Sequence, residues 1–174
     1  MSPAHLLNGK KILIVDDESD ILETLADLLD MCFTETIQDF DTAAKLLEER
    51  SYDAAILDIM GVNGYELLKV ATQHGTPALM LTAHALTADN LIASIKGGAY
   101  AYLPKDKMVE IEDYLVDLIK ARQKGDKKDK TWFNKLLPFF DAKFGDKWKE
   151  KDKAFWQDFD KTLVHSREEL EDIL

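Results

Sequence analysis

The chain has 174 residues, of which 22 are Lys or Arg and 33 are Asp or Glu, and its formal net charge at pH 7 is −11. This length allows one full domain and one small module, and it excludes two large domains. The negative charge argues against broad affinity for nucleic acids. The apolar runs are far shorter than the roughly 20 residues that span a bilayer, and residues 1–8 lack the basic and apolar segments of a secretory signal, so we expect a cytoplasmic protein without membrane insertion.

Short apolar runs alternate with segments of helical periodicity from residue 9 to residue 124. This alternation is typical of repeated βα units around a parallel sheet. Most of the runs lack polar alternation, as strands covered on both faces do. We therefore predict an α/β fold with a doubly wound, five-stranded parallel sheet. The predicted strands are Lys11–Val15, Thr34–Gln38, Ala54–Leu57, Ala78–Leu81 and Tyr100–Leu103.

Helices are predicted between these strands, and short polar side chains indicate where they begin. Ser19 or Asp20 is expected to cap the first helix, Asp41 the second and Thr87 the fourth, because each side-chain oxygen can accept a hydrogen bond from an unpaired backbone N–H. The last helix, residues 111–122, shows the clearest pattern, with one apolar stripe at helical spacing.

The composition changes after this helix. Residues 125–130 carry no apolar side chain and begin with a glycine, so we predict a linker there. Residues 131–174 hold all three Trp and six of the eight Phe, and we predict that they form a small all-α extension. A module of 44 residues is too small for a deep core, so we expect it to pack on the first domain, on a second copy or on a partner.

Aromatic and apolar side chains in the extension recur every four residues, as on one face of a helix. We expect two amphipathic helices with a break near Pro138 or Gly145. The stripes on which this prediction rests are Trp132, Leu136, Phe140, Phe144 and Trp148 in the first helix, and Phe155, Phe159 and Leu163 in the second.

Acidic side chains gather where the predicted strands end. Asp16, Asp17 and Glu18 follow the first strand, and Asp58 follows the third. Taken alone, Asp16 and Asp17 fit a helix N-cap equally well. In an open parallel sheet, however, the carboxyl ends of the strands form the active crevice, so three or more carboxylates would converge and repel one another unless a cation neutralised them. Mg²⁺ suits such oxygen ligands and keeps positions open for a phosphate.

Two further side chains at the same edge suit a phosphate. Thr82 ends the fourth strand and offers a hydroxyl, and Lys105 follows the fifth strand and offers an ammonium group. Together with the carboxylates, these groups predict phosphoryl transfer to an aspartate, with Asp58 as the nucleophile.

Four segments of the sequence, given below in chain order, closely resemble the receiver domain of two-component response regulators. The resemblance covers about residues 9–124 and implies the flavodoxin-like fold of that family. It implies that Asp58 accepts a phosphoryl group from a histidine kinase or a phosphotransfer protein in a phosphorelay. The segments are Ile12-Leu-Ile-Val-Asp-Asp-Glu18, Ile56-Leu-Asp-Ile-Met60 followed by Asn63-Gly64, Leu79-Met-Leu-Thr-Ala83 and Gly98-Ala-Tyr-Ala-Tyr-Leu-Pro-Lys-Asp106.

The resemblance also implies a role for each site residue. Asp16 and Asp17 would hold Mg²⁺ together with Asp58 and the backbone carbonyl of Met60. Thr82 would bond one phosphoryl oxygen, and Lys105 would pair with another. Movement of Thr82 would be coupled to an inward turn of Tyr102, which reshapes the face made by the fourth helix, the fifth strand and the fifth helix.

The sequence departs from the family pattern near these residues. Gly61 stands where proline is common, Asn63 stands where Asp is common, and Asp106 replaces a frequent proline after Lys105. Met60 and His84 occupy positions that tune hydrolysis of the phosphoryl group in the family. Met60 cannot position an attacking water, so we expect a long-lived phosphorylated form, with His84 as a solvated loop residue.

The same residues argue against two other functions. A phosphatase of the aspartyl-nucleophile type would have a second Asp where Met60 stands, and a scaffold that cannot be phosphorylated is disfavoured by the intact acidic residues, Thr82 and Lys105. We expect a signalling protein that is not an enzyme and that catalyses only its own phosphorylation and dephosphorylation.

The extension is not expected to bind DNA. Residues 125–153 carry nine Lys against six acidic residues, but residues 154–174 carry two basic and six acidic side chains, and no helix-turn-helix pattern is evident. We expect protein contacts instead, either with an unknown downstream protein or in a homodimer. The homodimer would form through the C-terminal helices or through the face of the fourth helix, fifth strand and fifth helix.

Overall fold

The computed structural model describes residues 3–83, 86–125 and 129–160. The chain separates into two compact units, Met1–Lys127 and Lys128–Leu174. In the described part of the chain, no helix combines the length and the apolar character needed to cross a bilayer.

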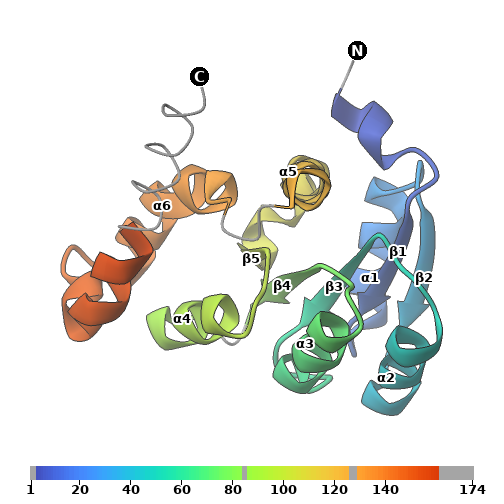
Figure 1. Ribbon diagram of the computed structural model, residues 1–174, viewed down its shortest axis with the longest axis horizontal. Coiled ribbons are helices and arrows are strands. Elements are labelled where there is room, and N and C mark those ends of the chain that lie inside the picture. Colours follow the sequence, from blue (N-terminus) through green and yellow to red (C-terminus); the bar gives the residue numbers. More distant parts are fainter. Residues whose placement is uncertain (1–2, 84–85, 126–128, 161–174) are drawn as a thin grey trace. The chain divides into compact units, whose positions relative to one another are not determined.

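The first unit is built on five parallel strands in the order β2-β1-β3-β4-β5 (Figure 1). This arrangement confirms the predicted parallel α/β sheet, with strand ends that shift by one residue at most. Every residue of β3, β4 and β5 is buried, which explains why these strands lack polar alternation. The strands are β1 Lys11–Val15, β2 Phe33–Ile37, β3 Ala54–Asp58, β4 Ala78–Thr82 and β5 Ala101–Pro104.

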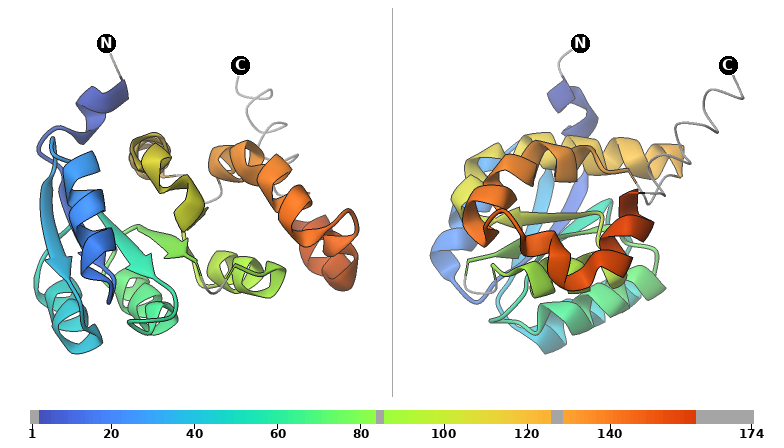
Figure 2. Two further views of the ribbon diagram at one scale, coloured as in Figure 1. Left: turned by 180° about the vertical axis from the view of Figure 1, so that it is seen from behind. Right: turned by 90° about the vertical axis from the view of Figure 1, so that its left-hand side faces the viewer.

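Helices cover both faces of the sheet, as a doubly wound fold requires. Helices α1 and α5 lie on one face, and α2, α3 and α4 lie on the other (Figures 1 and 2). The short 3₁₀ helix η1, Pro3–Leu7, packs against α5. The α-helices are α1 Ser19–Leu28, α2 Phe40–Glu49, α3 Gly64–Gln73, α4 Ala88–Lys96 and α5 Ile111–Lys124, and a second 3₁₀ helix, η2, spans Lys105–Glu110.

The helix starts agree with the sequence prediction in one case and differ in two. Thr87 caps α4, since its hydroxyl accepts the N–H of Asn90 at 3.1 Å. The prediction for α2 is wrong, because Asp39 accepts the N–H of Thr42 while Asp41 lies within the first helical turn. A cap needs extended backbone just before the helix, and Asp39 has it (φ −129°, ψ 154°).

The prediction for α1 is also wrong. Its N-cap is Glu18, which makes no side-chain capping bond, so neither Ser19 nor Asp20 caps this helix. The backbone N–H of Glu18 donates instead to Asp16 Oδ1 at 2.9 Å. The start of α1 is therefore tied to a carboxylate at the end of β1.

The second unit begins with α6, Thr131–Phe144, followed by the 3₁₀ helix η3, Trp148–Asp152, and a helical segment over residues 153–160 (Figure 2). The sequence predicts a break near Pro138 or Gly145, and the structure confirms the second, because α6 runs through Pro138 and ends before Gly145, whose φ is 92°. Proline removes one helical hydrogen bond. Leu136 and Phe140 are buried on either side of it, and this burial favours an unbroken helix.

Aromatic rings form the core of this unit. The Phe133 ring lies 5.5 Å from Trp156 and 4.9 Å from Phe159, and Trp156 lies 4.9 Å from Trp148, measured between ring centroids. Trp156 is buried and Phe155 is half-buried, so the stripe predicted through Phe155 does not mark the most buried face of the second helix.

Candidate functional site

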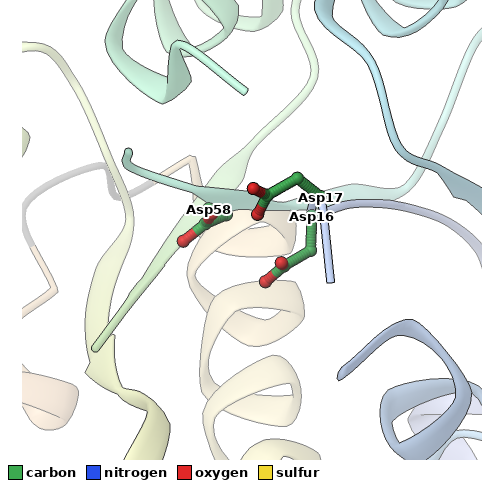
Figure 3. A group of neighbouring side chains, drawn as sticks. All are labelled: Asp16, Asp17 and Asp58. Carbon is green, nitrogen blue, oxygen red and sulfur yellow. The ribbon is translucent and has the colours of Figure 1, made fainter. Parts of the chain in front are cut away.

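The topology brings the predicted site residues to one edge of the sheet. Asp16 and Asp17 follow the last residue of β1, and Asp58 is the last residue of the adjacent strand β3. Figure 3 shows their side chains next to one another at these strand ends. One carboxylate oxygen from each residue can be chosen so that all three lie within 4.8 Å of one another.

Lys105 provides the cation of this cluster. It opens η2, directly after β5. Its Nζ lies 2.9 Å from Asp16 Oδ2, 3.4 Å from Asp58 Oδ1 and 3.7 Å from Glu18 Oε2. The Lys105 side chain is only 8% exposed, so these ion pairs are poorly screened by solvent. Glu18, which the sequence places in the predicted carboxylate cluster after Asp16 and Asp17, adds a fourth carboxylate beside the lysine.

Burial and crowding perturb the charged groups. Burial raises the pKa of Asp16, and the charge of Asp58 raises it further, while the Glu18 N–H and Lys105 oppose the shift. Burial by itself lowers the pKa of Lys105, but the hydrogen bond and charge of Asp16, with Asp58 and Glu18, raise that pKa by more. Lys105 therefore stays protonated, and one ammonium faces several carboxylates.

The donor set fits a hard divalent cation. Asp16 is almost fully buried and Asp58 is 6% exposed, and carboxylates brought together in this way are stabilised by additional positive charge. Carboxylate oxygens are the ligands that Mg²⁺ and Ca²⁺ prefer. The Met60 side chain is 63% exposed, and participation of the Met60 backbone carbonyl stays a prediction.

Two predicted switch residues lie on neighbouring strands. Thr82 is the last residue of β4 and is 1% exposed, and Tyr102 lies on β5 and is fully buried. Burial raises the pKa of the Tyr102 phenol, and a hydrogen bond from the Thr87 backbone opposes that shift. His84, predicted to be a solvated loop residue, lies outside the described residues.

The turn between β3 and α3 closes tightly over the site. The Gly61 N–H donates to Asp58 Oδ2 at 3.2 Å, and the Gly64 N–H donates to the Ile59 carbonyl at 2.9 Å. Asn63 adopts the left-handed conformation, with φ 55°, as Asn does in turns. Sequence reasoning identified the turn residues but missed the contact of Gly61 with Asp58.

Comparison with known proteins agrees with this geometry. The family model described as "Response regulator receiver domain" matches residues 12–116. The transcriptional regulatory protein TcrA of Mycobacterium tuberculosis is 35% identical over 105 residues, which cover 57% of this chain and 41% of TcrA. CpxR of Escherichia coli K12, also a transcriptional regulatory protein, is 39% identical over 100 residues, which cover 55% of this chain and 42% of CpxR. The chain thus spans about two fifths of the length of these curated relatives.

Solved structures share the fold of the first unit. A response regulator receiver domain from Clostridium thermocellum has a TM-score of 0.59 at 26% identity, over 66% of this chain and 97% of that chain. A CheY-like receiver domain from Methanospirillum hungatei has a TM-score of 0.57 at 26% identity, over 66% of this chain and 99% of that chain.

A third structure is similar in fold alone. It is a response regulator from Burkholderia pseudomallei with a phosphorylated aspartic acid, a calcium ion and citrate. It has a TM-score of 0.54 at 22% identity, over 66% of this chain and 72% of that chain.

The family match spans more than half of the chain. It includes the three clustered aspartates and Lys105, which the fold brings to one edge of the sheet. The chain therefore belongs to the receiver-domain family of two-component response regulators.

Proposed function

We propose that Asp58 accepts a phosphoryl group from a histidine kinase or a phosphotransfer protein, in a reaction that requires Mg²⁺. The observation that carries this proposal is the convergence of Asp16, Asp17 and Asp58, with Lys105 Nζ 3.4 Å from Asp58 Oδ1. Strand β3 lies between β1 and β4, so Asp58 has the carboxylates on one side and Thr82 on the other. The central position of Asp58 supports its role as the acceptor.

Each site residue has a separate role in the proposed phosphoryl transfer. Asp16 and Asp17, with Asp58 and the Met60 carbonyl, would hold Mg²⁺, which when bound neutralises negative charge on the phosphoryl oxygens. Lys105 supplies a fixed positive charge, and Thr82 supplies a hydroxyl that donates to a phosphoryl oxygen. An Asp58 carboxylate oxygen attacks phosphorus in line. The new O–P bond replaces the P–N bond of the phosphohistidine donor, whose nitrogen keeps the bonding electron pair.

The phosphorylated form is proposed to be long-lived. The Met60 side chain is exposed and carries no group that can orient an attacking water. The protein thereby catalyses its own phosphorylation and, slowly, its own dephosphorylation.

The proposed output is a change in protein–protein contacts. Tyr102, coupled to Thr82, would reshape the face of α4, β5 and α5, and residues 131–174 would serve as a helical contact module after a linker at 125–130. The downstream partner is a second copy or an unidentified protein. A molar mass by light scattering that rises on phosphorylation only when residues 131–174 are present would identify the second copy, and an unchanged mass would favour a different protein.

Intact mass spectrometry after incubation with acetyl phosphate tests the acceptor. Wild-type protein should gain one phosphoryl group with Mg²⁺ and none with a chelator, and Asp58→Asn should gain none. Asp53→Asn is the matched control, because Asp53 precedes β3 at its other end, where its carboxylate accepts the Lys11 N–H at 2.8 Å. Labelling that survives Asp58→Asn would refute the assignment.

A further inference from the structure

One glycine of the turn between β3 and α3 packs directly against the carboxylate cluster. A β-carbon built on Gly61 would overlap the Asp17 carboxylate, both oxygens and the carbon between them. Gly61 is not among the glycines with positive φ, so its backbone conformation does not itself require glycine. The absence of a side chain is needed there for space, and the Asp17 carboxylate fills that space.

The same residue contacts a second carboxylate through its backbone. The Gly61 N–H donates to Asp58 Oδ2 at 3.2 Å. Gly61 therefore touches two of the three clustered aspartates: its N–H bonds Asp58, and its missing side chain leaves the space that the exposed Asp17 carboxylate occupies.

The turn cannot easily move away from Asp17. Gly64 closes the turn through the hydrogen bond to the Ile59 carbonyl, and a β-carbon on Gly64 would overlap the Asp58 backbone carbonyl. Backbone thus packs on backbone at one side of the turn, and the Asp17 carboxylate packs on Gly61 at the other. A side chain at position 61 would have to be accommodated mainly by displacing Asp17.

We propose that Gly61 is a positioning residue whose missing side chain lets the Asp17 carboxylate face the other two aspartates, and that it thereby makes the cation site selective for a small divalent ion. The inference rests on the proposed Mg²⁺ function of the cluster. Mg²⁺ requires near-ideal geometry with short oxygen distances, whereas Ca²⁺ accepts longer distances and more variable arrangements. Displacing one of three carboxylates therefore weakens Mg²⁺ binding more than Ca²⁺ binding.

Isothermal titration of full-length Gly61→Ala with each ion, without a phosphodonor, tests the proposal. The Kd for Mg²⁺ should rise about tenfold or more, in the range found when groups that orient metal ligands are changed, and the Kd for Ca²⁺ should rise less. A Mg²⁺ Kd within about twofold of wild type, or equal increases for both ions, would overturn the proposal. Wild-type protein that binds neither ion would instead refute the Mg²⁺ function.

A control variant and a stability measurement separate this effect from general instability. Gly125→Ala introduces strain at φ 69° with no atom within 4 Å of the added β-carbon, so it should leave both Kd values unchanged. Without metal, Gly61→Ala should change the free energy of unfolding little, because the exposed Asp17 carboxylate can turn away from the added β-carbon. A large destabilisation without metal would contradict the proposal, because it would show that the substitution disrupts the turn and does not simply displace Asp17.

Discussion

Lys105 forms ion pairs with three carboxylates of the site. Its ammonium lies within 4 Å of the carboxylates of Asp16, Asp58 and Glu18, and it is largely shielded from solvent. A buried charge of this kind is held in place before the reaction, so it can stabilise developing negative charge without reorganisation.

Replacing Lys105 by Gln should therefore slow phosphorylation by acetyl phosphate about 10²-fold, the size of effect that removal of one preorganised donor has. The rate of mass increase at saturating Mg²⁺ measures this. Lys107→Gln is the control, because Lys107 is 39% exposed and pairs with Glu110 at 3.9 Å, away from the cluster. Equal rates in the two variants would contradict a role for Lys105.

The sequence predicts some of these residues and not others. Asp16, Asp58 and Lys105 are predictable because parallel strands end at one edge, so position along the chain determines position in space. The packing of Gly61 against Asp17 is not predictable in this way. It depends on the side-chain conformation of Asp17 and on the path of the turn, neither of which follows from hydrophobic periodicity.

Helix α2 shows how one polar residue fixes the start of an element. Asp39 accepts the N–H of Thr42 at 2.8 Å, and this backbone bond, then the Thr42 side chain, lowers the pKa of Asp39 below its ordinary 3.8. Since the folded-state pKa is lowered, the stabilisation is present in full above the unfolded-state pKa and is lost as pH falls through the folded-state pKa.

Asp39→Ala should lower the midpoint of urea unfolding at pH 7, and the difference from wild type should vanish in acid below the lowered pKa. Asp41→Ala is the matched control, because Asp41 keeps only the favourable charge–dipole effect of the first turn and should lower the midpoint less. If Asp41→Ala lowered the urea midpoint more than Asp39→Ala, the prediction from sequence that Asp41 caps α2 would be correct after all.

The helices and strands differ in how well the hydrophobic pattern of the sequence predicts them. Strand β1 matches its prediction because burial on both faces gives a continuous apolar run, and α5 has the expected stripe because burial on one face gives a helical period. The residue that caps a helix cannot be identified from periodicity when two aspartates stand two residues apart, as Asp39 and Asp41 do. Of the two predicted positions for a break in the extension, Gly145 is confirmed and Pro138 is not, because side chains on both sides of Pro138 are buried in one continuous helix.

The two units of the molecule carry separable properties. Residues 1–124 hold 11 basic and 21 acidic side chains, so most of the negative charge lies with the receiver. All three Trp lie in residues 131–174. Tryptophan emission therefore reports on the second unit, and the proposed phosphorylation at Asp58 would report on the first.

Phe133→Ala should destabilise the second unit by about 3 kcal/mol, because Phe133 is 3% exposed and packs on Trp156 and Phe159. The urea midpoint measured by tryptophan emission should fall, while the extent of labelling by acetyl phosphate should not change. Phe139→Ala, at a half-buried ring, should lower the midpoint less. Loss of labelling in Phe133→Ala would show that the units do not act separately.

At this scale the sequence predicted the receiver better than the extension. The order of βα units along the chain predicts a parallel sheet, and the right-handed connections between such strands limit its topology. The aromatic residues of the extension predict helices and a composition boundary, but their ring contacts join Phe133 to Trp156, which belong to neither predicted stripe. Such contacts arise from how helices pack, and helical spacing alone does not contain that information.

The location of the phosphoryl group tests the central claim most directly. Full-length protein labelled with acetyl phosphate and Mg²⁺ can be reduced with borohydride, which converts a phosphorylated aspartate to homoserine, and then digested and analysed by peptide mass spectrometry. We predict homoserine at position 58 and at no other aspartate. Homoserine at Asp16 or Asp17, or none after labelling of intact protein, would contradict the proposed site.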